Sequence, residues 1–193
     1  MIPTSYSLLG QLQASEEPAW QRFTDLYGPL FRGWLRRAGI RPGDADDLAQ
    51  DVITVVLRRL PDFQHNGRTG AFRAWLRTIC VNCCRDFARS ARGRPAVVGG
   101  TDFDSYLDRL ADPNDDLAQQ WEREHDLVIT RRLLDTIERE FEPRTWVAFR
   151  RVAIQGERAS DVAQDLEMTP NAVLIAKSRI LARLRELAAG ILD

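Results

Sequence analysis

The sequence has almost no lysine. Lys177 is the only one among 27 lysines and arginines, so nearly all positive charge is carried by arginine. Arginine is the better residue for contacts with phosphates and base edges, because its planar guanidinium group offers paired donors. The formal net charge is only −1, so acidic segments must balance the arginine-rich ones.

Long apolar runs are also absent. No stretch approaches the roughly 18 apolar residues that a membrane span needs. The first residues, MIPTSYSLLGQLQASEE, lack the basic start and apolar segment of a secretion signal. We therefore predict a cytoplasmic protein without a membrane span.

Cysteine and histidine are scarce as well. The three cysteines, Cys80, Cys83 and Cys84, lie within one predicted helix, which favours free thiols in a reducing compartment over a disulfide framework. A zinc site would need a fourth ligand and usually two separated pairs. His65 and His125 are isolated, with no nucleophile–base spacing near them. We predict neither a metal site, nor a cofactor, nor catalysis.

Apolar residues recur at three- and four-residue steps, and no segment alternates as a strand would. This pattern predicts an all-α protein. Gly28-Pro29 should kink or split the first helix, and Asp44 should cap the second, with Asp47 completing a capping box. The predicted helices cover residues 18–38, 44–60, 71–91, 117–141, 143–155, 159–167 and 170–189.

The second predicted helix carries a polar stripe at positions i, i+3, i+4, i+7 and i+11. Its members are Asp47, Gln50, Asp51, Thr54 and Arg58. Such a stripe is either a solvated helix face or a surface for a protein partner, and the stripe alone leaves both interpretations open.

A polar loop and an arginine-rich helix follow. The loop at residues 62–70 contains Phe63, His65 and Asn66. Positive charge beside aromatic and polar groups suits a nucleic-acid strand whose bases have left the stack. The helix at residues 71–91 combines an apolar face with Arg73, Arg77, Arg85 and Arg89, and Asp86 is the one acid among them.

Residues 94–118 are rich in Gly, Pro and Asp and show no sustained period. We predict a flexible acidic linker there, with a reach on the order of 25–30 Å. It would separate two small helical domains, residues 1–93 and 119–193.

The C-terminal part has the pattern of a helix-turn-helix. Thr169 should cap its second helix, with Pro170 in the first turn. The outward residues should face base edges in the major groove, with the more distant arginine on phosphates. A helical hairpin in an ordinary bundle is the alternative. The candidate DNA contacts are the outward residues Asn171, Ile175, Ser178 and Arg179, with Arg183 further along the helix on a phosphate.

Taken together, DADDLAQDV, FRAWLRTICVNCCRDFARSAR and the helix-turn-helix resemble the extracytoplasmic-function type of bacterial RNA polymerase sigma factor, of the sigma-70 family, over about residues 14–187. The resemblance implies that the polar stripe docks on the clamp helices of the largest subunit of core RNA polymerase. It also implies that the C-terminal domain recognises the −35 promoter element and that the loop and arginine-rich helix open the −10 element. The implied −10 contacts are Phe63, His65, Asn66, Trp75, Arg77, Asn82, Arg85, Asp86 and Arg89.

This chain departs from the family pattern at three points. Glu167 stands at the turn position that glycine usually fills, which predicts strain there. Arg158 replaces a capping Ser or Thr, and the last helix has VLIAKSR where the family often has a shorter, more basic run.

The resemblance implies a factor that directs transcription initiation on promoter DNA. Because the net charge is near neutral, the free protein should bind promoter DNA poorly and gain affinity on the polymerase. Two domains on a long linker would also allow an anti-sigma factor to clamp them. The alternatives are a helix-turn-helix regulator that acts without core polymerase and a helical adaptor.

Overall fold

The computed structural model describes residues 8–14, 17–90, 101–189 and 191–192. Within these ranges the chain forms helices and no strand, which confirms the all-α prediction. None of these helices is both long and apolar enough to cross a membrane. The elements are α1 Leu8–Gln13, α2 Glu17–Arg37, α3 Pro42–Arg59, the 3₁₀ turn η1 Leu60–Asp62, α4 Ala71–Ser90, α5 Thr101–Ala111, α6 Asp116–Ile137, the 3₁₀ turn η2 Glu138–Glu140, α7 Pro143–Phe149, the π-helical turn η3 Arg150–Ile154, α8 Ala159–Asp165 and α9 Pro170–Ala188.

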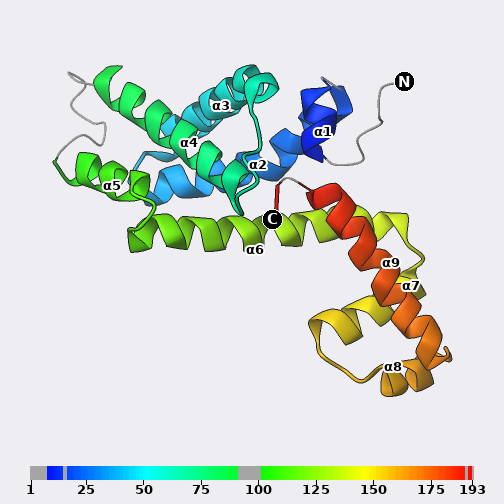
Figure 1. The fold of residues 1–193 in the computed structure, drawn as a ribbon. Coiled ribbons are helices and arrows are strands. Elements are labelled where there is room, and N and C mark those ends of the chain that lie inside the picture. Colours follow the sequence, from blue (N-terminus) through cyan, green and yellow to red (C-terminus); the bar gives the residue numbers. More distant parts are fainter. Residues whose placement is uncertain (1–7, 15–16, 91–100, 190, 193) are drawn as a thin grey trace.

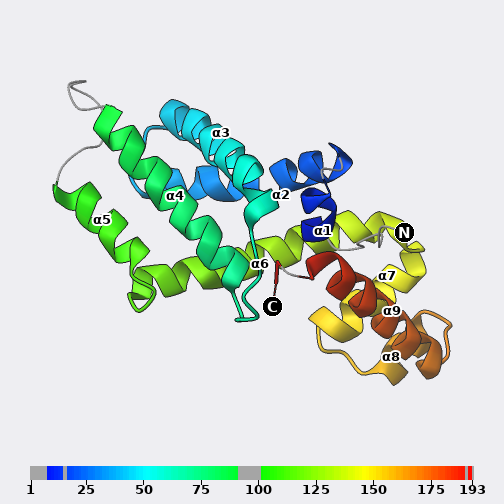
Figure 2. The same cartoon turned by 45° about the horizontal axis from the view of Figure 1, so that its top comes forward.

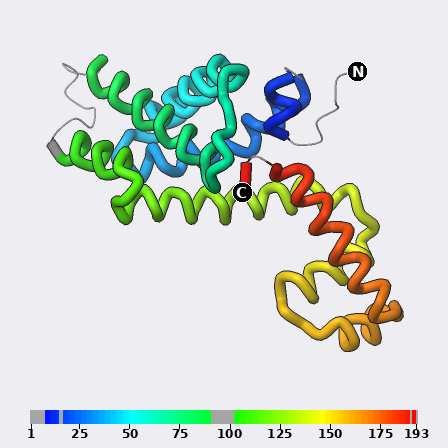
Figure 3. Tube along the Cα trace, viewed as in Figure 1, coloured from blue at the N-terminus to red at the C-terminus, as the bar shows by residue number. Residues whose placement is uncertain are grey.

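The long helix α6 organises the arrangement. It runs along one side of the group formed by α2, α3 and α4, with α5 beside its N-terminal end (Figure 1). Helices α7, α8 and α9 extend away from its other end, and α9 returns to contact α6 (Figures 2 and 3). Both halves of the chain therefore share α6.

The core of the first half is aromatic. Phe23, Tyr27 and Phe31 follow one another at four-residue steps on α2, and all three are fully buried. The Phe23 and Tyr27 rings stack with centroids 4.4 Å apart, and Phe72 of α4 meets the Tyr27 ring edge-on. Each such ring contributes about 1.5–3 kcal/mol by leaving water. This core fixes α2 against α4.

Helix α2 continues through Pro29, so Gly28-Pro29 does not split the helix in two. Proline lacks an N–H and so leaves the carbonyl group four residues earlier, that of Asp25, without its helical donor. Arg132 of α6 supplies the replacement, with Nη1 donating to the Asp25 carbonyl oxygen at 3.1 Å. A residue distant in sequence thus offsets the cost of the proline.

The N-cap prediction for α3 is also wrong. The helix begins at Pro42, with Arg41 as the capping residue and no side-chain hydrogen bond there. Proline at the first helical position has its φ already set for a helix, so the helix starts two residues before Asp44. Asp44 lies instead in the first turn, where its charge suits the helix dipole.

The linker prediction is wrong for the described part of residues 94–118, while residues 94–100 lie outside the described ranges. Residues 101–111 form α5, whose Phe103, Leu107 and Leu110 are buried against α4 and α6. These three residues occur at i, i+4 and i+7, a helical period that the many aspartates obscure. The predicted boundary at residue 119 lies inside α6, so these elements form no flexible spacer.

The second half has a smaller core made from small side chains. Ala148 of α7 packs with Val162 and Ala163 of α8 and with Val173 and Ala176 of α9. Small residues allow the three helices to approach closely, as a helix-turn-helix requires. On α9, Val173, Ala176 and Ile180 recur at steps of three and four residues and form a buried apolar stripe.

Candidate polymerase and nucleic-acid interfaces

The polar stripe of α3 is exposed on a firmly packed helix. Asp47, Gln50, Asp51 and Arg58 are exposed, and Thr54 is half-buried. The Thr54 hydroxyl group donates to the Gln50 carbonyl oxygen at 2.9 Å. The opposite face is anchored by Ala45, Leu48, Ala49, Val52, Ile53 and Val56, which are all buried. The stripe is thus a continuous polar surface on a rigid support.

Phe63 does not lie on the surface. Its ring is buried against Phe72 and Trp75, with ring centroids 5.4 and 4.9 Å away. In this arrangement Phe63 supports the loop from beneath and is not accessible to a base.

His65 and Asn66 are the exposed members of the same loop. His65 Nδ1 accepts a hydrogen bond from the Gly67 N–H at 3.1 Å, and Asn66 Oδ1 accepts one from the Arg68 N–H at 3.0 Å. Turns closed by a side chain in this way give a loop a defined shape. Both residues therefore occupy fixed, solvent-facing positions directly before α4.

Gly70 joins this loop to α4. Its φ is +78°, in the left-handed region that glycine enters without strain. A Cβ there would lie 2.7 Å from the guanidinium atoms of Arg73. Glycine is required, because it gives both the turn and the space in which the Arg73 guanidinium group lies.

The α4 residues predicted to contact DNA fall into two sets. Asn82, Asp86 and Arg89 are exposed, and Asp86 forms an ion pair with Arg89 one turn later. Trp75 and Arg85 are half-buried. The exposed set lies toward the C-terminal half of the helix.

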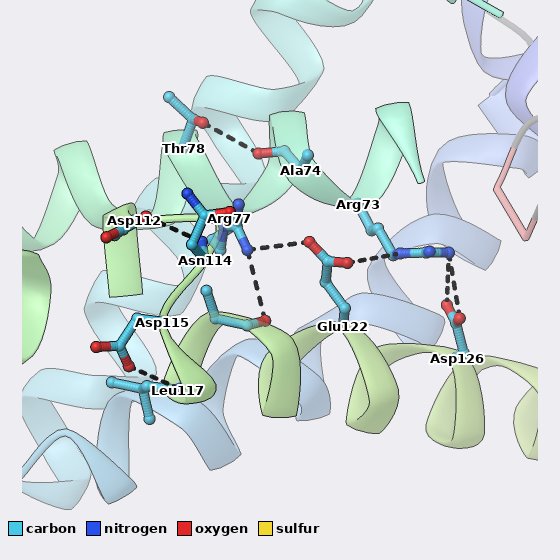
Figure 4. A network of polar contacts seen from close by, with 11 residues as sticks. Arg73, Ala74, Arg77, Thr78, Asp112, Asn114, Asp115, Leu117, Glu122 and Asp126 are labelled. Atoms are coloured by element: carbon cyan, nitrogen blue, oxygen red, sulfur yellow. Dashed lines mark hydrogen bonds and ion pairs between the residues drawn. The ribbon is translucent and has the colours of Figure 1, made fainter. Parts of the chain in front are cut away.

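Arg77, also predicted to contact DNA, is buried beneath α6. Its Nη1 donates to Glu122 Oε1 at 3.0 Å and to the Ala118 carbonyl oxygen at 3.4 Å. Arg73 lies beside it, 3.6 Å from Glu122 and 3.1 Å from Asp126 (Figure 4). Only 6% of the Arg77 side chain and 11% of the Arg73 side chain is exposed. Carboxylates of α6 therefore hold this part of the arginine face.

A buried histidine extends the same network toward α2. His125 Nε2 lies 3.1 Å from the Tyr27 hydroxyl oxygen, and Nδ1 lies 2.9 Å from Asp126 Oδ1. Its ring stacks on Trp121, with centroids 5.6 Å apart. Burial lowers the pKa of His125, and the hydrogen bond to Asp126 opposes that shift. The neutral imidazole joins tyrosine to carboxylate, so α6 is fixed to both α2 and α4.

The turn of the helix-turn-helix contains the strain that the sequence predicted. Glu167 has φ +50°, a left-handed conformation that is uncommon for a residue with a Cβ. The Met168 N–H donates to the Ala163 carbonyl oxygen at 2.8 Å, and the Glu167 N–H donates to that of Gln164 at 3.3 Å. This is the hydrogen-bond pattern of a Schellman motif. The Arg144 guanidinium group also donates to the Glu167 carbonyl oxygen, so α7 braces the turn.

Helix α9 begins as predicted. Thr169 Oγ1 accepts a hydrogen bond from the Ala172 N–H at 3.1 Å, and Pro170 is the first helical residue. Arg158 occupies the corresponding position before α8 and makes no side-chain cap. The helix proposed to enter DNA is therefore the better-capped of the two.

The outer face of α9 is open except at one position. Asn171, Ile175, Ser178 and Arg179 are exposed, whereas Arg183 binds Glu140 through two hydrogen bonds of 2.6 and 3.0 Å. Sequence reasoning missed a further exposed residue of this face. Leu174 is 51% exposed beside Ile175 at 49%, and only its place outside the apolar stripe could have revealed it.

The cysteines are part of the core region of α4. Cys80 and Cys84 are buried, Cys83 is half-buried, and all three are free thiols, as predicted. Burial raises the pKa of Cys83 to about 11, so its thiolate is scarce at neutral pH. Within the described ranges, no group of three or more His, Cys, Asp or Glu side chains is placed to hold a metal ion.

Comparison with known proteins agrees with this geometry. Residues 23–94, which contain most of α2 and all of α3 and α4, match the sigma-70 region 2 family. The ECF RNA polymerase sigma factor ShbA of Streptomyces griseus is 34% identical over 154 residues, which cover 76% of this chain and 75% of ShbA. The ECF RNA polymerase sigma factor BldN of Streptomyces coelicolor is 34% identical over 99 residues, 51% of this chain and 36% of BldN.

Among solved structures, the chain is similar to the RsbN–BldN complex at 20% sequence identity and a TM-score of 0.37. That match covers 91% of this chain and 96% of the other. The family itself rests on ShbA, which is 34% identical over three quarters of both chains. The protein therefore belongs to the extracytoplasmic-function sigma factors of RNA polymerase.

Proposed function

We propose that the protein brings core RNA polymerase to promoters by binding the largest-subunit clamp helices through the α3 stripe. The observation that carries this proposal is the position of the stripe. The exposed residues of α3 are separated from the exposed His65–Asn66 turn only by η1, Phe63 and Gln64. A polymerase held on α3 would thus have the DNA-opening loop directly beside it.

The loop and α4 would open the −10 element. His65 and Asn66 offer polar groups to an unpaired base, and Asn82, Asp86 and Arg89 continue that surface along α4. An unstacked base needs new hydrogen bonds and new stacking to replace those it loses. Trp75, half-buried beside the loop, can provide the stacking surface.

Helix α9 would recognise the −35 element as duplex. Asn171, Ser178 and Arg179 can form hydrogen bonds with base edges and phosphates. Leu174 and Ile175 have no polar group to offer. In the major groove such side chains contact the methyl group of thymine, so we expect thymine at the bases they face.

The test is in vitro transcription with bacterial core polymerase on a promoter library. The variant Gln50→Ala with Asp51→Ala should lose at least tenfold in transcription and in core binding, while binding of α9 to duplex DNA is kept. The matched control, Gln119→Ala with Asp135→Ala, removes the same residue types from exposed positions of α6 and should behave as wild type. Full transcription and core binding by the stripe variant would show that the stripe does not hold the polymerase. No transcription by the wild-type protein, with duplex binding kept, would favour a helix-turn-helix regulator that needs no polymerase.

A further inference from the structure

Three acidic residues of α5 and α6 cover the arginine face of α4. Glu122 binds Arg77 and Arg73, Asp126 binds Arg73, and Asp108 of α5 accepts a hydrogen bond of 2.7 Å from Arg85 Nη2. Figure 4 shows the Glu122 and Asp126 contacts along α6. We name these three acids, Asp108, Glu122 and Asp126, the acidic clasp.

The clasp uses the donors that a phosphate would use. Carboxylate and phosphate oxygens both bind the paired N–H groups of a guanidinium, so they compete for the same atoms. Because Arg73 and Arg77 are almost fully buried under the clasp, a DNA strand cannot reach them while α6 is in place. Arg85 is partly accessible, and its exposed pair with Asp108 is weak.

Apolar contacts keep the clasp closed. Trp121 of α6 meets Trp34 of α2 edge-on, with ring centroids 4.1 Å apart, and it is 2% exposed. His125 is bonded to Tyr27 on the same side of α6. If α6 moved away, Trp121 and His125 would become exposed to water. Contacts between DNA and three arginines would not offset that cost, so DNA alone does not open the clasp.

We propose that the arginine face of α4 binds either the acidic clasp or the phosphates of the promoter strand, and that engagement by core polymerase exchanges the first for the second. This inference rests on the proposed function for the identity of the opening partner. The competition between carboxylate and phosphate is independent of the promoter sequence.

The first experiment measures binding of the free protein to a fluorescent, mixed-sequence, single-stranded DNA of 20 nucleotides. The clasp variant is Asp108→Asn, Glu122→Gln and Asp126→Asn. It should bind at least tenfold more tightly than wild type, and the slope of log Kd against log salt should steepen by about 2, as three more phosphates are neutralised at about 0.7 each. The control, Asp104→Asn, Asp135→Asn and Glu138→Gln, changes net charge equally at exposed acids of the same segment.

The control should gain less than threefold, since it leaves the clasp intact. Equal gains by both variants would mean that net charge alone acts and would overturn the proposal. Circular dichroism checks that the clasp variant remains helical.

A second measurement uses only the wild-type chain, in case the clasp variant unfolds. Phenylglyoxal modifies accessible arginines, and mass spectrometry locates the adducts. Arg73 and Arg77 should react at least tenfold more slowly than the exposed Arg68 in the free protein, and should become reactive when core polymerase is added without DNA. Equal reactivity in the free protein would overturn the clasp. Failure to bind polymerase, with Arg73 and Arg77 still protected, would instead contradict the proposed function.

Discussion

The two helices proposed to contact DNA differ in what covers them. On α4, Arg73 and Arg77 are buried beneath the carboxylates of α6. On α9, the residues facing outward from Asn171 to Arg179 are exposed. The protein thus presents its proposed −35 surface while part of its proposed −10 surface is closed, which would keep the free factor from opening DNA before it meets the polymerase.

The cores beneath the two helices differ in the same sense. Buried aromatic rings join α2, α4 and α6, whereas α8 packs against α7 and α9 through a small cluster of alanine and valine. The closed side is held by large apolar contacts and buried ion pairs, and the packing of α8 on α9 by few and small ones. Each prediction below tests one part of this contrast.

The largest effect should come from the aromatic core. Replacing the fully buried Phe31 with Ala should lower the free energy of unfolding by about 3–5 kcal/mol, through lost burial and the cavity left behind. Val173→Ala in the small core should cost only about 1–2 kcal/mol. Urea unfolding followed by circular dichroism measures both, and equal losses would contradict the contrast between the cores.

The buried histidine should make the closed side sensitive to acid. The pKa of His125 is lowered in the folded state, so below about pH 6.5 the unfolded chain binds a proton that the folded chain does not. The free energy of unfolding should therefore fall as pH drops from 7 to 5, by at most about 1.4 kcal/mol per pH unit. The imidazole is surrounded by Tyr27, Asp126, Arg73 and Glu122, and the variant described next replaces none of them.

Urea unfolding at several pH values measures the slope. His125→Gln should flatten it, and His65→Gln, at the exposed histidine, should leave it as in wild type. A slope that survives His125→Gln would show that other groups carry the pH dependence.

A substitution at Glu167, in the strained turn between α8 and α9, should increase the stability of the protein. Glu167→Gly should raise the free energy of unfolding by about 0.5–1 kcal/mol, because glycine adopts φ +50° without a Cβ penalty. Gly156→Ala is the opposite control: its φ is +74°, nothing lies near the added Cβ, and it should destabilise by a similar amount. Loss of stability in Glu167→Gly would mean that the Glu167 side chain contributes more than its backbone costs.

The smallest effect concerns the exposed aliphatic pair on α9. Replacing a contacted thymine in the −35 duplex by deoxyuridine removes one methyl group and should weaken holoenzyme binding about fourfold, or about 0.8 kcal/mol. Leu174→Ala with Ile175→Ala should abolish this sensitivity. If no thymine position responds in wild type, these side chains do not recognise methyl groups.

Residues that act with near neighbours were predictable from the sequence. The α3 stripe, the start of α9 at Thr169, the strain at Glu167 and the buried cysteines each follow from spacing of three or four residues or from one backbone preference. The N-cap prediction at Asp44 was wrong because Pro42, two residues earlier, already has a helical φ. These are local effects, and the sequence contains them.

Contacts between distant segments were not predictable in the same way. The Arg77–Glu122 and Arg132–Asp25 contacts join residues 45 and 107 positions apart, and no periodicity marks them. When each helix is considered alone, the charged side chains of α4 and α6 are expected to face solvent or to bind DNA, and not to pair with each other. For the same reason α5 was taken for a linker, since its three aspartates obscure the spacing of its three buried apolar residues.

The most direct test is the distance between the two halves of the chain. Labels introduced at Thr78 on α4 and Arg185 on α9, both exposed, can be followed by energy transfer in the free protein and in the complex with core polymerase and promoter DNA. The separation should increase on assembly, because α4 must leave the clasp on α6 to bind the promoter strand while α9 still contacts α6. An initiating complex in which this distance is unchanged would contradict the closed and open forms proposed here.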